Sequence, residues 1–355
     1  MRQRDRMVAV GFWVCAVAGG VWPMASPAAQ QPLKNVRFVI PGQTTSGWPV
    51  YVAQQRKIFE KNGLAVELIV VRGSPNLVRA VASHSAPMGR MNPDHVIGAI
   101  EKGARIRVVG GIQDRIAQDL MAHPAISRGA DLKGKTIAVS TLTGGLTVII
   151  DEALEKSYGL KKGEYKYLVV GTSPDRFAAL KGGSVHAALL GAPFNFTAAQ
   201  QGFTKLIMLD DVVGPVQFIV DFAHQDYIRD HRDEVVRYLQ STIEATEWLY
   251  NPKNKEDALA IHMRALKSTR ETAEQDYRFT IQDFQSFTRG GAVNAAAWGK
   301  TMELRAKSGL YNGRAIPAMG TFMDSSIVQE AQRRAGYRPS QRDRSGNVRG
   351  SADTR

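Results

Sequence analysis

The residues best suited to hold a small molecule lie in one short loop, Ser140 to Gly145 (S-T-L-T-G-G). The loop follows a short β-branched run, Thr136 to Val139, and precedes a segment with helical periodicity. The first N–H groups of a helix have no intrahelical partner, so a helix N-terminus attracts anions and polar ligands. The hydroxyls of Thr141 and Thr143 and the flexible Gly144 therefore favour binding of a polar or anionic ligand.

The segment just before this loop also matches the spacing of a phosphate-binding P-loop. Gly129 to Thr136 reads G-A-D-L-K-G-K-T. A P-loop follows a strand and opens a helix, so that its amides and lysine converge on phosphates. Here Lys135 and Thr136 open a strand instead. We therefore interpret the segment as a solvated turn that enters a strand, and we expect no nucleotide site.

Other catalytic signatures are not found in the sequence. The chain has one cysteine, Cys15, in the N-terminal apolar run, so the mature protein is expected to contain no disulfide, cysteine nucleophile or thiolate metal site. There is no G-x-S-x-G elbow and no H-E-x-x-H motif. The histidines show no ligand spacing, so we expect neither a metal nor another cofactor. They are His84, His95, His123, His186, His224, His231 and His262.

The N-terminus has the order of a cleavable signal peptide. Arg2, Arg4 and Arg6 precede an uncharged run, Val8 to Trp22, and small residues follow to Ala29. The run is short for a transmembrane helix, which needs about 20 apolar residues. Residues 1–28 are therefore predicted to be a signal peptide, and the mature protein is predicted to lie outside the cytoplasmic membrane.

The charge of the chain is unevenly distributed. The formal net charge is +13, of which +2 belongs to residues 1–28 and +5 to residues 333–355. The basic tail, residues 337–355, has the composition of a disordered segment. The remaining +6 belongs to the body of the chain, which has no stripe of alternating aromatic and basic residues. This charge therefore favours attraction of a small anion over binding of nucleic acid.

Strands and helices alternate through the first two thirds of the chain, as in an α/β protein with largely parallel sheets. At 355 residues the chain is long enough for two lobes. Strands are predicted at 36–40, 64–71, 86–89, 105–110, 136–139, 165–170 and 185–190, and helices at 49–59, 75–83 and 146–158. Val216 to Phe222 is apolar enough to return to the first lobe, and Tyr227 to Tyr250 begins a helical C-terminal third.

The two lobes look like two copies of one architecture. V-V-R-G-S-P-N ends in Asn76, V-V-G-T-S-P-D ends in Asp175, and both runs place serine before proline at a predicted helix start. The distance from Thr44 to Ser74 is 30 positions, as is that from Thr143 to Ser173. Loops at the carboxyl ends of parallel strands meet at one edge, so two facing lobes would enclose a ligand.

Three runs carry a family resemblance that covers nearly the whole mature chain. Pro49 to Leu68 (P-V-Y-V-A-Q-Q-R-K-I-F-E-K-N-G-L-A-V-E-L), Asp131 to Val139 and Phe177 to Pro193 resemble ABC-transporter substrate-binding proteins of the nitrate, sulfonate, taurine and thiamine-precursor (NMT1/THI5-like) family. The resemblance implies a two-lobed periplasmic-binding-protein fold of type II. The implied lobes are residues 29–120, residues 121–216, and residues 217–336, which complete the first lobe and add C-terminal helices.

The resemblance also implies a function and a set of site residues. It implies a periplasmic protein that captures a small organic ligand and delivers it to a membrane permease, and we expect a monomer. The implied pocket residues are Thr44, Ser46, Trp48, Ser74, Asn92, Thr141, Thr143, Gly144, Ser173 and Asn195. The alternative roles are helix capping for Ser74, Asn92 and Ser173 and core packing for Trp48.

Two other classes of protein remain open from the sequence. The family includes fungal enzymes that make the thiamine pyrimidine, although their cysteine-rich motif has no counterpart in the mature chain. A ligand-sensing domain that contacts a signalling partner would share every predicted pocket residue.

Overall fold

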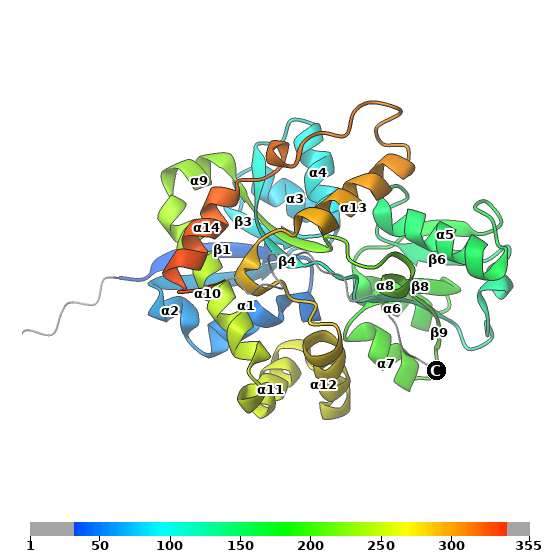
Figure 1. Ribbon diagram of the computed structural model, residues 1–355. Coiled ribbons are helices and arrows are strands. Elements are labelled where there is room, and N and C mark those ends of the chain that lie inside the picture. The colour runs from blue at the N-terminus through cyan, green and yellow to red at the C-terminus, as the bar shows by residue number, and fades with distance from the viewer. Residues whose placement is uncertain (1–31, 339–355) are drawn as a thin grey trace, which may run out of the picture. The chain divides into compact units, whose positions relative to one another are not determined.

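The computed structural model describes residues 32–338, which fold as two lobes built around two five-stranded sheets (Figure 1). The predicted signal peptide and residues 339–355 of the predicted basic tail lie outside the described residues. Within residues 32–338, no helix combines the length and the apolar character needed to span a membrane.

The first sheet has the strand order β2-β1-β3-β10-β4. Its strands are β1 (Lys34–Ile40), β2 (Leu64–Val70), β3 (Met88–Met91), β4 (Ile106–Gln113) and β10 (Ile219–His224). Strands β2 and β3 pair with β1 in parallel, whereas β10 is antiparallel to β3 and β4. The apolar segment predicted to return to the first lobe therefore supplies the antiparallel strand of the first sheet.

The second sheet repeats this arrangement with the strand order β7-β6-β8-β5-β9. Its strands are β5 (Gln118–Ala122), β6 (Thr136–Val139), β7 (Lys166–Val169), β8 (Ala187–Gly191) and β9 (Thr204–Met208). Strands β7 and β8 are parallel to β6, and β5 is the antiparallel member. The second sheet thus begins at Gln118, within the range that the resemblance assigned to the first lobe.

Helices follow most strands, and proline begins several of them. The helices are α1 (Trp48–Gln55), α2 (Ile58–Lys61), α3 (Ser74–Ala82), α4 (Pro93–Glu101), α5 (Gly145–Tyr158), α6 (Ser173–Lys181), α7 (Phe194–Gln200), α8 (Leu209–Val213), α9 (Gln225–Asp230), α10 (Arg232–Tyr250), α11 (Lys255–Leu266), α12 (Arg270–Tyr277), α13 (Ala295–Lys307) and α14 (Ser325–Arg334). Helices α3, α4 and α6 have proline in their first turn, where its missing N–H is not needed. Helix α5 ends, as predicted, at Gly159, which adopts the left-handed conformation.

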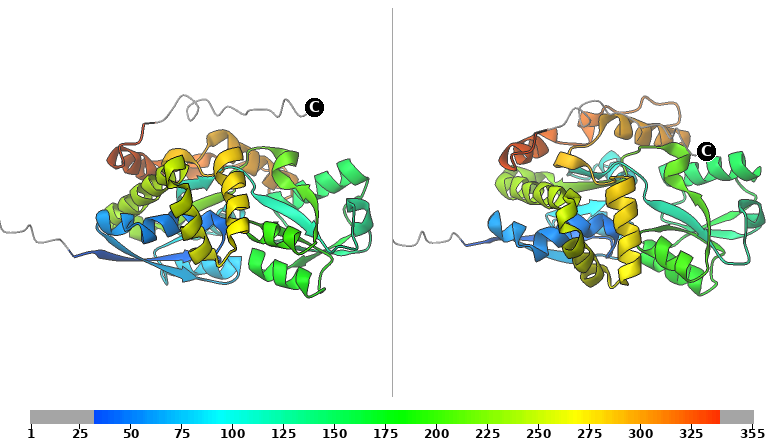
Figure 2. Two further views of the ribbon diagram at one scale, coloured as in Figure 1. Left: turned by 90° about the horizontal axis from the view of Figure 1, so that it is seen from below. Right: turned by 60° about the horizontal axis from the view of Figure 1, so that its bottom comes forward.

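Most of the C-terminal third lies with the first lobe. Figure 2 shows the red and light-green helices beside the blue elements, while the green elements of the second sheet lie on the other side. Helices α12 and α13 also contact α7 and α5 of the second lobe. The long helix α10 packs on the first lobe, with Tyr238 stacked on Phe38 of β1 at a ring-centroid distance of 4.5 Å. The predicted buried face of the C-terminal helices is confirmed, since Val235, Val236 and Leu239 are buried.

Several predicted elements differ in detail. The helix predicted over 49–59 is broken into α1 and α2, because Lys57 takes a left-handed conformation. The helix predicted from Tyr227 is divided into α9 and α10. The central strand β5 and the edge strand β9 were not predicted. By contrast, Thr136 begins β6 as expected, so the P-loop-like segment leads into a strand.

Candidate ligand-binding cavity

A cavity of about 90 Å³ lies between the two lobes, at the ends of the strands of both sheets. From the first lobe it is lined by the loop after β1 and by the residues at the ends of β2, β3 and β4. From the second lobe it is lined by the residues after β6, β7 and β8. The geometry is that expected for facing α/β lobes, in which the carboxyl ends of parallel strands form the ligand crevice.

Five of the ten residues that the resemblance implied line this cavity. They are Thr44, Ser46, Ser74, Asn92 and Ser173. The other five do not line it: Trp48, Thr141, Thr143, Gly144 and Asn195. The structure thus brings the first-lobe loops and the start of α6 together. Ser140 and Leu146, on either side of the loop before α5, also line the cavity, whereas Thr141, Thr143 and Gly144 between them do not. Direct ligand contact by any of the ten remains a prediction.

The two serines differ from the helix caps that their sequence context suggested. Ser74 and Ser173 are the first residues of α3 and α6, and they follow Gly73 and Thr172 at the cap positions. The Ser173 hydroxyl accepts hydrogen bonds from the Gly191 N–H at 3.0 Å and from Arg176 Nη2 at 3.2 Å. Both serines are buried and line the cavity.

The other three predicted residues on the cavity wall are Asn92, Thr44 and Ser46. Asn92 is a helix cap, and it accepts the Asp94 N–H at 3.0 Å while its own amide donates to the Phe218 carbonyl. The Thr44 and Ser46 hydroxyls are hydrogen-bonded to each other at 2.9 Å. Asn92 therefore caps α4 and lines the cavity at the same time.

Arg176 is the cationic side chain on the wall of the cavity, and sequence reasoning missed it. Its side chain is buried, and Nε donates to the Leu189 carbonyl at 2.6 Å while Nη1 donates to the Gly171 carbonyl at 2.7 Å. It forms no ion pair with any residue of the described chain. Burial lowers the pKa of Arg176 to about 10, against the opposing effect of Asp175. The guanidinium therefore stays charged at neutral pH.

A signal for Arg176 was present in the repeated sequence. Ser74-Pro75-Asn76-Leu77 of the first lobe corresponds to Ser173-Pro174-Asp175-Arg176 of the second. Leu77 is a fully buried core residue, so its counterpart is expected to be buried too. The second copy therefore places a cation at a position that the first copy fills with an apolar residue, and this difference makes Arg176 a candidate site residue.

A second buried arginine, Arg90, holds the loop after β1. It pairs with Asp221 through two hydrogen bonds of 2.7 and 2.8 Å, and its Nη1 donates to the Ser46 carbonyl at 2.6 Å. Burial opposes the charge on Arg90, but the Asp221 carboxylate outweighs it and raises the pKa of Arg90 above its ordinary value. Arg90 thus positions the cavity loop while its own charge is neutralised.

Two more polar groups on the cavity wall were not predicted. The side-chain amide oxygen of Gln118, Oε1, is buried and has no hydrogen-bond partner among the described residues. Burial lowers the pKa of His95, and Asp94 opposes this shift while Arg305 and Arg176 add to it. The cavity therefore combines a charged arginine, a neutral imidazole, an amide and several hydroxyls.

The loop at the start of α5, which the sequence favoured as a binding element, is engaged by the protein itself. The Asp94 carboxylate of the first lobe accepts the Gly145 N–H at 3.0 Å through Oδ2 and Arg305 Nη1 at 2.9 Å through Oδ1. Gly144 has a φ of +130°, and a Cβ at this position would lie 3.0 Å from Asp94 Oδ2, so a side chain would be strained here. Nearby, the Thr141 hydroxyl donates to the Thr143 carbonyl. An internal carboxylate thus occupies this helix N-terminus.

Trp48 and Asn195 lie in buried clusters beside the cavity. Trp48 is fully buried and packs edge-on against His262 at a ring-centroid distance of 4.6 Å. His262 in turn contacts Asp276 at 2.7 Å, and Asp276 accepts the Thr45 hydroxyl. Asn195 donates to Asp119 at 2.8 Å. Trp48 therefore has the core-packing role that was its alternative.

The two lobes contact each other around the cavity. The Thr45 N–H donates to the Ala192 carbonyl at 3.2 Å, which joins the loop after β1 to the loop after β8. The contact between Asp94 and Gly145 joins α4 to α5, and the ion pair between Lys307 and Glu152 at 2.9 Å joins α13 to α5. The structure is therefore a closed conformation.

Comparison with known proteins supports this architecture. A relative from Brucella abortus (strain 2308), named as a binding protein, is 26% identical over 250 residues, which are 68% of this chain and 76% of the relative. The alkanesulfonate-binding protein SsuA from Xanthomonas axonopodis pv. citri, solved with MOPS, has a TM-score of 0.64 at 17% identity and covers 84% of this chain and 98% of its own. The desulfurization enzyme DSZB has a TM-score of 0.61 at 14% identity, with coverages of 85% and 99%.

These likenesses confirm the predicted fold class, the two-lobed periplasmic-binding-protein fold. They also show that the fold alone does not separate binding proteins from enzymes, since both occur among the similar structures. A sequence profile described as NMT1/THI5-like matches residues 44–255, more than half of the chain, and the chain therefore belongs to the NMT1/THI5-like family.

Proposed function

We propose that this protein is an extracytoplasmic solute-binding protein that captures a small organic anion in the cavity between its lobes and delivers it to an ABC permease. The observation that carries the proposal is the buried Arg176 on the cavity wall, whose partners in the described chain are all neutral. A buried charge without a counter-ion is costly, so an anionic ligand would offset that cost on binding.

Other features of the cavity favour the same kind of ligand. The starts of α3 and α6 both reach the cavity, and a helix N-terminus favours a negative group by about 0.3–1 kcal/mol when exposed and more when partly buried. The cavity volume of about 90 Å³ is far below the roughly 300–1,000 Å³ of sites for drug-sized molecules. The closed state therefore suits a ligand of few atoms, with a sulfonate or carboxylate group next to Arg176.

We further propose that binding is not followed by turnover. The single cysteine of the chain is Cys15, so residues 32–338 offer no thiol nucleophile. The relatives from Brucella are named as binding proteins, as is the sulfonate-binding structural neighbour. A ligand recovered chemically unchanged after prolonged incubation is the expected result.

The proposal is tested by identifying the compound that co-purifies with the protein and titrating it back by calorimetry. The variant Arg176→Gln should bind that compound at least about tenfold more weakly, since hydrogen bonds to charged groups contribute about 1.5–3 kcal/mol. Lys181→Gln, an exposed change on the same helix, should bind like the wild type. Equal affinity in the Arg176 and Lys181 variants, or a compound that carries no negative group, would contradict the proposal.

A further inference from the structure

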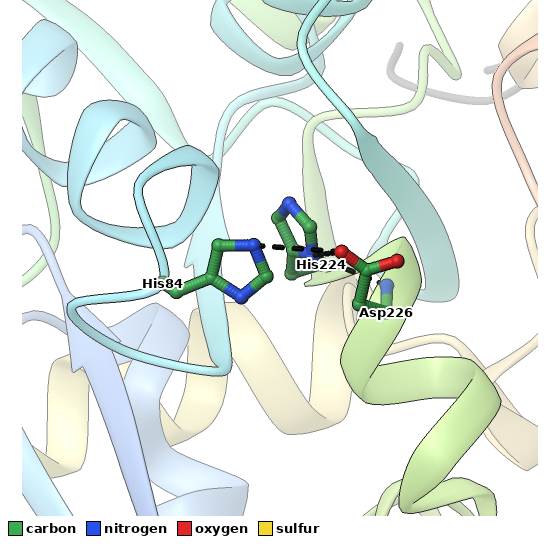
Figure 3. Close-up of side chains that lie close together, drawn as sticks. All are labelled: His84, His224 and Asp226. Atoms are coloured by element: carbon green, nitrogen blue, oxygen red, sulfur yellow. Dashed lines mark hydrogen bonds and ion pairs between the residues drawn. The ribbon is translucent and has the colours of Figure 1, made fainter.

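Two histidines and an aspartate converge at a second place in the first lobe, outside the cavity (Figure 3). His84 lies in the turn between α3 and β3, His224 is the last residue of β10, and Asp226 lies in α9. Strand β10 is antiparallel to β3, so the end of β10 lies beside the start of β3. None of the three residues lines the ligand cavity. Their wide separation in sequence explains why the spacing of the histidines gave no sign of a metal site.

The three donor atoms have a spacing that suits one metal ion. Asp226 Oδ2 lies 3.6 Å from His84 Nε2 and 3.7 Å from His224 Nδ1. Both distances are too long for hydrogen bonds. With metal–ligand bonds of about 2.0–2.2 Å, two ligands of a tetrahedral ion lie about 3.4 Å apart. The two separations from Asp226 differ from that value by a few tenths of an ångström. The imidazole rings of His84 and His224 lie with their centroids 3.5 Å apart, so they must separate to share one ion, and rotation of the exposed His84 side chain would allow this.

The hydrogen bonds of these groups leave one oxygen of Asp226 available, while the His224 nitrogen already accepts a hydrogen bond. Asp226 Oδ1 accepts Arg105 Nη2 at 2.7 Å and Arg229 Nη1 at 2.9 Å, whereas Oδ2 accepts no hydrogen bond from the described residues. His224 Nδ1 accepts the Asp226 N–H at 3.1 Å, so this nitrogen is unprotonated and would exchange that hydrogen bond for the ion. The two arginines hold the carboxylate in place as outer-sphere partners.

We propose that His84, His224 and Asp226 form a site for a divalent late first-row transition-metal ion, with solvent in the remaining coordination position. Two imidazoles and one carboxylate suit Cu²⁺, Zn²⁺ and Ni²⁺, of which Cu²⁺ binds such ligands most tightly. The guanidinium groups of Arg105 and Arg229 repel a cation, so the site requires an ion that bonds strongly to imidazole. The His84 side chain is 55% exposed, which gives the ion a path from solvent.

The conformation of His84 and the role of His224 determine which variants test the proposal. His84 has a φ of +61°, which asparagine adopts more readily than most residues, so His84→Asn removes the imidazole and keeps the turn. His224 caps α9, and asparagine is a favourable cap, so His224→Asn also keeps its structural role. His123→Asn, at an exposed histidine of the second lobe, is the matched control.

The experiment uses the mature protein without an affinity tag, because a polyhistidine tag would bind the same ions. Titration with Cu²⁺, followed by calorimetry and by electron paramagnetic resonance, should show one ion per chain with nitrogen hyperfine coupling. His84→Asn and His224→Asn should each weaken Cu²⁺ binding at least about tenfold. His123→Asn should leave it unchanged, and His84→Asn should leave binding of the co-purified compound unchanged. Failure of the wild type to bind Cu²⁺, or unchanged Cu²⁺ affinity in His84→Asn, would overturn the proposal.

Discussion

Two buried arginines in this protein have different electrostatic partners, and the difference separates a structural role from a binding role. The Arg90 charge is neutralised by Asp221, and both side chains are almost wholly buried. Arg176 is equally buried and donates to backbone carbonyls and a hydroxyl. Of these two arginines, only Arg176 has no anionic partner among the described residues, and it lines the cavity.

The structural role of Arg90 leads to a prediction about stability. Asp221→Asn leaves the Arg90 charge buried without a counter-ion, and breaking such a pair typically costs about 3–5 kcal/mol. The free energy of unfolding, measured by urea denaturation, should fall by roughly that amount. The loop that contains Ser46 should also lose order, because Arg90 holds the Ser46 carbonyl.

The control for this prediction is an exposed ion pair. Asp257 pairs with Arg56 at 3.4 Å, and both side chains are about half exposed or more. Asp257→Asn should change the free energy of unfolding by less than about 1 kcal/mol. If the Asp221 and Asp257 variants unfold at the same urea concentration, the buried pair does not have the role assigned to it.

At this scale the sequence located hydroxyls and amides better than charges. Thr44, Ser46, Ser74, Asn92 and Ser173 were implied by the family resemblance, and they line the cavity, where strand ends meet at one edge. Arg90 could not be placed, because its burial depends on contacts with a segment far away in the sequence, whereas the signal for Arg176 lay in the comparison of the two repeats. Asp221, the partner of Arg90, is 131 residues away.

At the scale of elements, the start of α5 shows how a correct local structure can lead to a different function. The sequence predicted the strand, the loop and the helix, and β6 and α5 confirm them. The N-terminus of α5 nevertheless receives the carboxylate of Asp94 from the other lobe. This helix end therefore joins the two lobes in the closed structure, and only its flanking residues Ser140 and Leu146 line the cavity.

This contact predicts an effect of Asp94 on ligand affinity. In Asp94→Asn the negative charge at the start of α5 is lost, which should destabilise the closed state by about 1–2 kcal/mol. Because the ligand is enclosed in the closed state, calorimetry should show an affinity for the co-purified compound that is roughly tenfold weaker. Small-angle scattering should show less compaction at equal ligand concentration.

An exposed ion pair at the same interface gives the comparison for Asp94. Glu152→Gln removes the pair between Lys307 and Glu152, whose side chains are 45% and 47% exposed. Its effect on affinity should be smaller, because exposed pairs contribute about 0–1 kcal/mol. Wild-type affinity in Asp94→Asn would show that the Asp94 contact does not contribute to closure.

Prediction of the elements failed where burial depends on distant partners. Strand β5 (Q-D-L-M-A) is buried throughout, yet it contains Gln118 and Asp119. Asp119 Oδ2 accepts a hydrogen bond from Asn195, which lies 76 residues further along the chain. A polar segment of this kind lacks the apolar pattern of a central strand, whereas β1, β6 and β8 are short apolar strands that the pattern revealed.

At the scale of the whole molecule, the exchange of antiparallel strands explains how two lobes form from one chain. Strand β5 enters the second sheet directly after β4 has completed an edge of the first, and β10 returns to the first sheet. Both crossings pass the cavity, which is lined by Gln118 at the start of β5 and by Ile219 at the start of β10. A rotation of the lobes about these crossings would open and close the cavity.

The most direct test of the central claim is a crystal structure of the protein with its co-purified compound. The predicted result is a closed structure in which a negatively charged group of that compound lies within about 3.2 Å of the Arg176 guanidinium and also contacts residues of the first lobe, such as Ser74. A compound bound elsewhere, or one that occupies this cavity without a negative group near Arg176, would contradict the account.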